Sequence, residues 1–216
     1  MKLILSKFLC GSFLFFQRPQ HYISYHSCKK WLHSEYSSNL LYGGNRSIPN
    51  CEHIVPKSII KKNDMDSRVQ NDLHMLWLAD RKINSHRQNY TFSKLNPQNE
   101  TNIKLDNLGM KIEHKKYHCM KNVPLRQFDP PSKSKGIIAR SVGYFYFTYT
   151  ETCVNDLLDM KTMIEWHKKY PVSKMEQERN QKIFEIQRNR NLFIDYPIFL
   201  PIYFSKWFVF FRKIKL

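Results

Sequence analysis

The spacing of apolar residues predicts helices in the carboxyl-terminal half of the chain. Ser173 is followed three residues later by Glu176, which is a capping box, and the apolar positions after it keep helical spacing to about Arg188. A shorter helix is predicted before it, marked by apolar residues from Leu157 onward and closed by Pro171, because the residue before a proline avoids the α region. This half of the chain is therefore expected to be mainly helical.

The stretch after Gly136 fits two kinds of element. Its run 144–149 is aromatic enough for a β-strand. Its apolar positions also fit one face of a helix, and we predict a helix on the following residues: Ile138, Val142, Phe145 and Tyr149. The polar stretch 96–102 is predicted to be a surface loop, and no internal repeat, heptad pattern or Gly/Ser-rich linker divides the chain.

Both ends of the chain are unusually apolar. Residues 8–16 have the length of the apolar part of a signal peptide, but no small-residue cleavage site follows them. They are either a cleaved signal or anchor, or an apolar element packed on the core. Residues 196–211 are mostly apolar or aromatic and precede a basic end, but prolines and a lysine interrupt them and the run is too short to span a membrane. Two alternatives remain for this tail: an interfacial anchor, and an extended segment packed on the domain.

Composition narrows the class of protein. The 216 residues suit one domain, since a domain takes roughly 100 to 200 residues. Hydrophobic residues make up 42% of the chain and aromatic residues 14%, which excludes a disordered chain of low hydrophobicity. Lys and Arg number 35 against 18 Asp and Glu, a net charge of +17. Such a charge attracts polyanions, so nucleic acid is the first expected partner and an anionic membrane surface the second.

The cysteines exclude one class of metal site and leave their pairing open. No two of them form a C-x-x-C pair, so a compact thiolate zinc site is not expected. Their number is odd, and the sequence does not fix any disulfide between them: Cys10, Cys28, Cys51, Cys119 and Cys153.

The densest group of polar residues lies between Cys51 and Tyr90, and its chemistry suits phosphodiester hydrolysis. That reaction needs a base to activate water and a hard cation to neutralise charge on the phosphate and the leaving oxygen. His53 is a natural base near neutral pH. Glu52 and Asn84 supply oxygen ligands of the kind that Mg²⁺ prefers.

The geometry of this group can be partly predicted. Asp80 is expected to cap a short helix on which Asn84 and Arg87, three residues apart, share a face while Ile83 turns inward. Neighbouring residues of a strand point to opposite sides, so Glu52 and the histidine after it can serve one phosphate only at the end or bend of a strand.

Each of these residues also has an ordinary structural reading. An isolated Glu-His pair is usually a solvated surface pair, and His74 and His86 more often have structural hydrogen bonds than metal ligands. Four basic residues form either a solvated face or phosphate contacts: Lys57, Lys61, Lys62 and Arg68.

Several segments, taken in order, resemble the endonuclease I family, the bacterial periplasmic and secreted nucleases with a ββα-metal (His-Me finger) active site. Residues 52–58 resemble the family pattern E-H-x-x-P-x-S, residues 72–76 resemble D-L-H-x-L, and residues 83–90 resemble V-N-x-x-R-x-N-[FY]. The match continues through four later segments: 128–131, 135–140, 178–180 and 187–195.

The resemblance implies a fold and a division of the chain. It implies an α+β single domain, mainly helical, with the ββα-metal motif at its active site. The nuclease domain would cover residues 40–197. It would be preceded by an apolar and basic segment, 1–39, and followed by an aromatic and basic tail, 198–216.

The resemblance also implies an activity: a nuclease that cuts DNA, and often RNA, with little sequence preference and leaves 5′-phosphate ends. His53 would be the general base, and Glu52 and Asn84 would hold one divalent ion, Mg²⁺ or another such as Mn²⁺ or Ca²⁺. Structural support of the site would come from three further residues: Asp72, His74 and Arg87.

One family feature has no clear counterpart, the arginine that stabilises the scissile phosphate. The candidates for a phosphate contact are all basic: Lys57, Lys61, Lys62, Arg68 and Arg140. We expect a monomer that is secreted or periplasmic, with an intracellular or viral-factory protein as the alternative. Two rival functions remain, a non-catalytic nucleic-acid binder on a nuclease scaffold and a basic protein of membrane surfaces that uses its two apolar ends.

Overall fold

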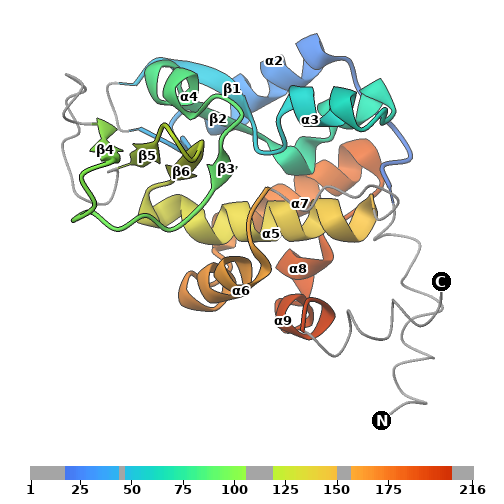
Figure 1. Cartoon of the computed structure of the whole chain (residues 1–216). Coiled ribbons are helices and arrows are strands. Elements are labelled where there is room, and N and C mark those ends of the chain that lie inside the picture. Colours follow the sequence, from blue (N-terminus) through green and yellow to red (C-terminus); the bar gives the residue numbers. More distant parts are fainter. Residues whose placement is uncertain (1–17, 44–46, 106–118, 150–156, 206–216) are drawn as a thin grey trace.

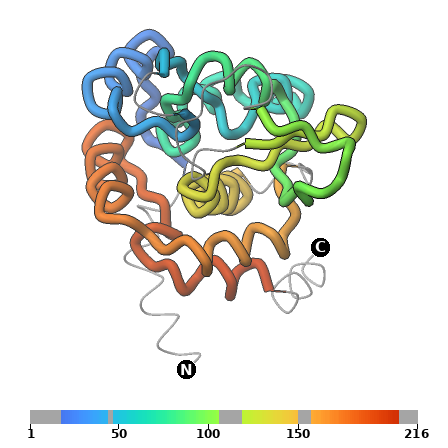
Figure 2. The backbone as a smooth tube through the Cα atoms, turned by 90° about the vertical axis from the view of Figure 1, so that its left-hand side faces the viewer, coloured from blue at the N-terminus to red at the C-terminus, as the bar shows by residue number. Residues whose placement is uncertain are grey.

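A long helix, α5 (Ser132–Thr148), runs through the middle of the molecule (Figure 1). The computed structural model describes residues 18–43, 47–105, 119–149 and 157–205. Helices α2, α3 and α4 and the strands lie on one side of α5, and helices α6, α8 and α9 lie on the other (Figure 1). Figure 2 looks along α5, which has the rest of the chain around it. This mixed architecture confirms the predicted α+β fold.

The helix predicted after Gly136 is present and begins four residues earlier, at Ser132. The core surrounds α5 closely, and Ile138, Val142 and Phe145 are fully buried in it. At Gly136 a β-carbon would collide with the carbonyl oxygen of Tyr170, so this position allows the end of α6 to approach. The aromatic run that also suited a strand is helical because both faces of α5 find partners.

The two helices predicted near the carboxyl end are also present. Helix α7 (Lys174–Gln187) has the capping box that was expected, and Arg188 ends it in the left-handed region with a φ of 59°. Helix α6 (Met160–Lys169) begins later than predicted, because Asp159 caps it and residues 157–158 instead pair with β3. Two short helices follow, α8 (Leu192–Asp195) and α9 (Phe199–Tyr203).

The strands form two small sheets. Strands β1 (Pro49–His53) and β2 (Leu76–Asp80) are antiparallel, and helix α4 (Arg81–Arg87) follows β2 directly. The second sheet has the order β3-β6-β5-β4. Its described strands are short: β3 (Thr91–Phe92), β4 (Asn102–Lys104), β5 (Met120–Asn122) and β6 (Gln127–Asp129). Among these strands β3 and β6 are parallel, and the other neighbouring pairs are antiparallel. The polar stretch 96–102 is the turn-rich connection that precedes and enters β4.

Three short helices link β1 to β2: α3 (Lys57–Lys62) and two 3-10 helices, η2 (Ser67–Asn71) and η3 (Leu73–Met75). Helix α2 (Tyr25–Tyr36) covers the hairpin of β1 and β2. Its buried residues Cys28 and Leu32 share a hydrophobic cluster with Leu76 and Leu78 of β2. Helix α2 is therefore packed on the hairpin of β1 and β2.

The two ends are described only in part. Residues 1–16, on which the signal prediction falls, and 206–211 of the predicted tail lie outside the described residues, as do Cys10 and Cys153. The described part of the tail, 196–205, includes α9, and its Leu200 and Phe204 are buried in the core. Within the described ranges, no helix combines the length and the hydropathy needed to cross a membrane. Cys28 and Cys51 are buried thiols that form no disulfide with a described residue.

Candidate active site

Strand β1 ends at His53, as a shared site for Glu52 and His53 requires. The Glu52 side chain points into the protein and is 2% exposed, whereas His53 is partly buried. After the strand the chain turns through Val55 and Pro56 into α3, and the backbone N–H of Ile54 donates to the carbonyl of Met75 at 3.0 Å. The end of β1 therefore presents an inward carboxylate beside an imidazole at the rim.

Arg87 holds this strand end in place from α4. Its Nη1 donates to the carbonyl of His53 at 2.9 Å and lies 3.1 Å from the Glu52 carboxylate, and its Nη2 donates to the carbonyl of Ile54 at 2.8 Å. The guanidinium carbon sits 4.5 Å from the ring centroid of Phe92, and the residue is 1% exposed. The buried guanidinium of Arg87 thus fixes both the Glu52 carboxylate and the backbone of His53.

Asn84 is brought to the same strand by α4. The Asp80 side chain caps this helix, as predicted, by accepting from the N–H groups of Lys82 and Ile83 at 2.9 and 3.0 Å. The Asn84 amide nitrogen donates to the carbonyl of Cys51 at 3.2 Å, which orients the amide group beside β1. Its oxygen accepts no hydrogen bond from the described residues, so it remains able to bind a ligand.

The hydrogen bond of His53 decides which of its nitrogens is basic. Nε2 lies 3.1 Å from the carbonyl oxygen of Gln70, and a carbonyl can only accept, so Nε2 carries the ring proton. Nδ1 is then left with its lone pair. Burial, and next the charge of Lys57, lower the pKa of His53 to about 3. The imidazole is therefore neutral at physiological pH, which is the state that accepts a proton.

Glu52 is in an environment that disfavours its charge. Burial raises the pKa of Glu52 to about 7, against the opposing effects of Arg87 and of the Tyr42 hydroxyl, which donates to the carboxylate at 3.2 Å. A bound cation would favour the charged form of this carboxyl group. A divalent ion that binds this carboxylate would therefore displace a proton from it at pH values below about 7.

The side chains beside the end of β1 include oxygen donors of the kind that a hard cation prefers. In the described residues no group of three or more His, Cys, Asp and Glu side chains is placed to hold a metal. Glu52 and Asn84 nevertheless offer a carboxylate and an amide oxygen at one strand end. Mg²⁺ in proteins is typically held by one or two such oxygens, with water and substrate phosphate completing its shell.

Asp72 and His74 lie in the interior and support the hairpin from behind. The Asp72 carboxylate is fully buried and accepts from four groups at 2.7 to 3.1 Å: the hydroxyls of Tyr144 and Tyr149, the His74 N–H and the Gln187 amide. His74 faces the Tyr144 ring, with 4.6 Å between ring centroids, and burial lowers its pKa to about 4. These contacts connect η3 to α5 and to the end of α7.

The five basic candidates have different surroundings. Lys61 and Lys62 are exposed at the end of α3, and Arg68 is exposed and paired with Asp66 at 2.6 Å. The Lys57 ammonium lies 3.9 Å from the ring centroid of Tyr25.

Arg140 requires a correction. It was a phosphate candidate, but it is 1% exposed and both of its forked nitrogens donate to Glu176, at 2.7 and 2.8 Å. Its third nitrogen donates to the carbonyl of Tyr170 at 2.9 Å. Because every bond is internal, this arginine joins α5 to α6 and α7 and does not face a substrate.

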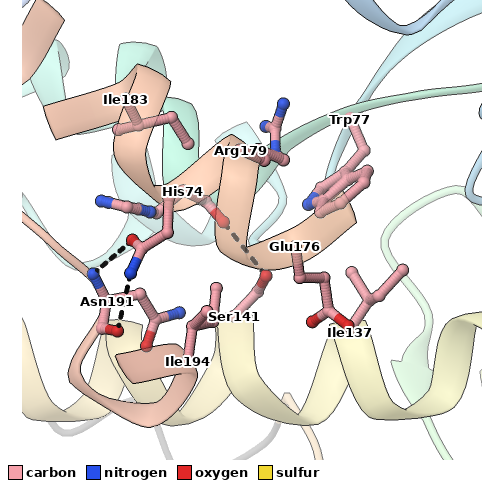
Figure 3. A pocket seen from close by; sticks show the side chains of 10 residues that line it. His74, Trp77, Ile137, Ser141, Glu176, Arg179, Ile183, Asn191 and Ile194 are labelled. Carbon is pink, nitrogen blue, oxygen red and sulfur yellow. Dashed lines mark hydrogen bonds between the residues drawn. The ribbon is translucent and has the colours of Figure 1, made fainter. Parts of the chain in front are cut away.

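The sequence did not reveal the role of Arg179, which supports the far side of the hairpin. Its Nη2 donates to the carbonyls of Leu73 and Leu76 at 2.7 and 2.6 Å, and its guanidinium carbon lies 4.2 Å from the ring centroid of Trp77. Figure 3 shows Arg179 and Trp77 beside a small interior cavity, which His74 and Ser141 also line. The sequence feature that could have indicated burial of Arg179 is its helical spacing with the apolar residues of α7.

Comparison with known proteins points to one family. The family model described as Endonuclease I matches residues 17–198. The chain is 31% identical over 126 residues to Endonuclease-1 of Buchnera aphidicola subsp. Acyrthosiphon pisum (strain APS), covering 58% of this chain and 45% of that protein. It is 29% identical over 135 residues to an extracellular deoxyribonuclease of Aeromonas hydrophila, covering 62% and 53%.

A further relative carries the name of a ribonuclease. The chain is 32% identical over 187 residues to an extracellular ribonuclease of Bacillus subtilis (strain 168), covering 76% of this chain and 57% of that protein. The chain thus spans about half the length of the relatives it matches. Because the family model covers most of the chain, including both strands and the helix that carry the site, the protein belongs to the endonuclease I family.

Proposed function

We propose that this protein is a metal-dependent endonuclease that hydrolyses phosphodiester bonds in DNA and RNA with little sequence preference. The observation that carries the proposal is the arrangement at the end of β1. A neutral His53 with a basic Nδ1 lies next to the buried carboxylate of Glu52, and α4 brings the Asn84 amide to the same strand.

In this proposal His53 takes a proton from the attacking water through Nδ1. Glu52 and Asn84 would hold one divalent ion, Mg²⁺ or another such as Mn²⁺ or Ca²⁺, which would neutralise charge on the phosphate and the departing 3′-oxygen. Departure of the 3′-oxygen leaves the phosphate on the 5′ end. Arg87 keeps the carboxylate and the histidine backbone in register, and Asp72 and His74 hold the hairpin from inside.

The choice of substrate follows from charge. A net charge of +17 favours binding through the phosphate backbone, and contacts to phosphate and sugar carry no sequence information. The relatives are named for both deoxyribonuclease and ribonuclease activity, so both nucleic acids belong in the proposal. Two of these relatives are named extracellular, which supports a site of action outside the cytoplasm.

The test is incubation of purified protein with supercoiled plasmid and, separately, with single-stranded RNA at a fixed salt concentration. We expect cutting with Mg²⁺, none with EDTA, and none by His53→Ala with Mg²⁺, because that variant lacks the base. His53→Ala should still retard DNA in a gel, since binding rests on the wider basic surface.

Two outcomes would contradict the proposal. Cutting by His53→Ala at the parent rate would remove this histidine as the base. A retained mobility shift without cutting by the parent protein, in any divalent ion, would instead indicate a non-catalytic nucleic-acid binder.

A further inference from the structure

The basic residues around the site differ in how much of their charge is available to a phosphate. The guanidinium of Arg87 is committed to Glu52 and to two carbonyls, and that of Arg68 is paired with Asp66. Arg140 is buried against Glu176. Lys57, by contrast, has no carboxylate partner in the described ranges of the chain. Its position four residues after His53 makes it the nearest positively charged residue in sequence to the proposed base.

An aromatic ring from another element holds this lysine. The Tyr25 ring of α2 lies 5.5 Å from the His53 ring, centroid to centroid, at an angle of 37°. The Lys57 ammonium lies 3.9 Å from the centroid of the same tyrosine, and the Lys29 ammonium lies 5.1 Å from it. Tyr25 therefore contacts both the proposed base and the lysine.

The kind of contact matters for the chemistry. A carboxylate would neutralise the ammonium, whereas the face of an aromatic ring orients a cation and leaves its net charge in place. An oriented, unneutralised cation stabilises negative charge that develops during a reaction, because little reorganisation is needed at that moment. Tyr25 can therefore orient a phosphate-binding lysine without neutralising its charge.

Helix α2 fixes Tyr25 in this position. The Ser24 side chain caps the helix by accepting from the N–H of Ser27 at 3.1 Å. One turn further on, Cys28 is fully buried against the hairpin, and its thiol donates to the carbonyl of Asn71 at 3.5 Å. The first turn of α2 is therefore attached to the same connection that supplies the His53 hydrogen bond.

We propose that Tyr25 is a positioning residue that holds the Lys57 ammonium beside His53, and that Lys57 is the cation that contacts the scissile phosphate. This inference rests on the proposed nuclease function and assigns its missing phosphate contact.

The test compares kcat and KM for plasmid cleavage by the parent protein and a set of full-length variants. Lys57→Met should lower kcat about ten- to hundredfold, with KM changed less than about threefold, because the lost charge acts on the transition state. Tyr25→Leu should lower kcat by a smaller factor, and Tyr25→Phe, which keeps the ring, should recover most of that loss. The double variant Tyr25→Leu/Lys57→Met should be no slower than Lys57→Met alone, because the two substitutions remove the same contact.

Lys30→Met is the matched control. Lys30 is exposed on α2, about 140° around the helix from Tyr25, and its loss changes the net charge by the same amount as Lys57→Met. Three results would overturn the inference while leaving the nuclease proposal intact: equal effects of Lys57→Met and Lys30→Met, losses that multiply in the double variant, or a loss confined to KM. Failure of the parent to cut, or cutting by His53→Ala, would overturn both.

A structural measurement tests the contact itself, without activity. Ring current from Tyr25 should shift the Lys57 Hε resonances upfield in NMR spectra of the parent and of Tyr25→Phe. The shift should disappear in Tyr25→Leu. Unshifted Lys57 resonances in the parent would mean that the ring does not hold this lysine, and the inference would fail.

Discussion

At the scale of single residues, the site depends on how many groups one side chain can hold at once. Arg87 contacts the Glu52 carboxylate and the carbonyls of His53 and Ile54 from a fully buried position. A guanidinium can do this because its donors point in fixed, diverging directions in one plane. The ammonium group of a lysine lacks this planar set of donors, so lysine and arginine are not equivalent at position 87.

Arg87→Lys is therefore expected to lower kcat/KM for plasmid cleavage about a hundredfold, because small displacements of reacting groups cost that much. Binding of DNA in a gel shift should change little. The control is Arg81→Lys, the same substitution at an exposed position of the same helix. Equal cleavage by the two variants would show that the Arg87 guanidinium does not position the site.

At the scale of elements, the helices are connected by buried polar contacts as well as by apolar packing. The bidentate pair of Arg140 and Glu176 joins α5 to the first turn of α7, and Glu176 is also the second half of the α7 capping box. Arg140 also reaches the end of α6 through the carbonyl of Tyr170. One buried pair thus sets the relative positions of three helices.

Arg140→Met should destabilise the fold by about 3 to 5 kcal/mol, because it leaves the Glu176 carboxylate buried without its partner. The free energy of unfolding in urea measures this. Lys174→Met removes a lysine from the exposed pair with Glu178, where N and O lie 3.7 Å apart, and should cost less than about 0.5 kcal/mol. A similar small cost for Arg140→Met would mean that the buried pair is not what joins these helices.

The elements that the sequence predicted well are those determined by neighbouring residues. The capping box at Ser173 and the cap at Asp80 act within three residues, and both are present. The role of Arg140 depends on Glu176, 36 residues away, and that of Arg179 on carbonyls more than 100 residues away. Residue type alone does not distinguish a buried arginine with such partners from one that faces phosphate.

The candidate site was predictable to a similar extent. The end of β1 at His53 and the placing of Asn84 on a capped helix follow from local sequence, together with the family resemblance. The Tyr25 contact does not, because α2 lies before the recognised motifs and meets them only through the packing of Cys28 and Leu32 on β2. The part of the site that the motifs do not predict therefore depends on contacts between segments that are distant in sequence.

At the scale of the whole molecule, burial of histidines connects stability to pH. His167 is 6% exposed, its Nε2 lies 2.8 Å from the carbonyl oxygen of Pro197, and burial, followed by the charge of Arg140, lowers its pKa to about 4. The folded protein therefore keeps this histidine neutral while the unfolded chain protonates it below about 6.5. Its contribution to stability is complete above that pH and is lost as the pH falls toward 4.

The expected result is a difference between the parent and His167→Gln. Between pH 6.5 and 4 the stability advantage of the parent should shrink by up to about 1.4 kcal/mol per pH unit, the value for one proton taken up on unfolding. Urea unfolding of both proteins across this range measures it, and the subtraction removes the titration of groups that the two share, Glu52 among them. Parallel stability curves would show that His167 is not held neutral by the fold.

The long-range bonds of the hairpin also set an order of events during synthesis. The motif from Glu52 to Arg87 leaves the ribosome before the residues that hold it: Tyr144, Tyr149, Arg179 and Gln187. A nascent chain that stops before residue 144 has the whole set of proposed catalytic groups but none of these bonds. The proposed activity would therefore arise only after residue 187 has left the ribosome and these bonds have formed, which delays any cutting of the messenger RNA to which the chain is still attached.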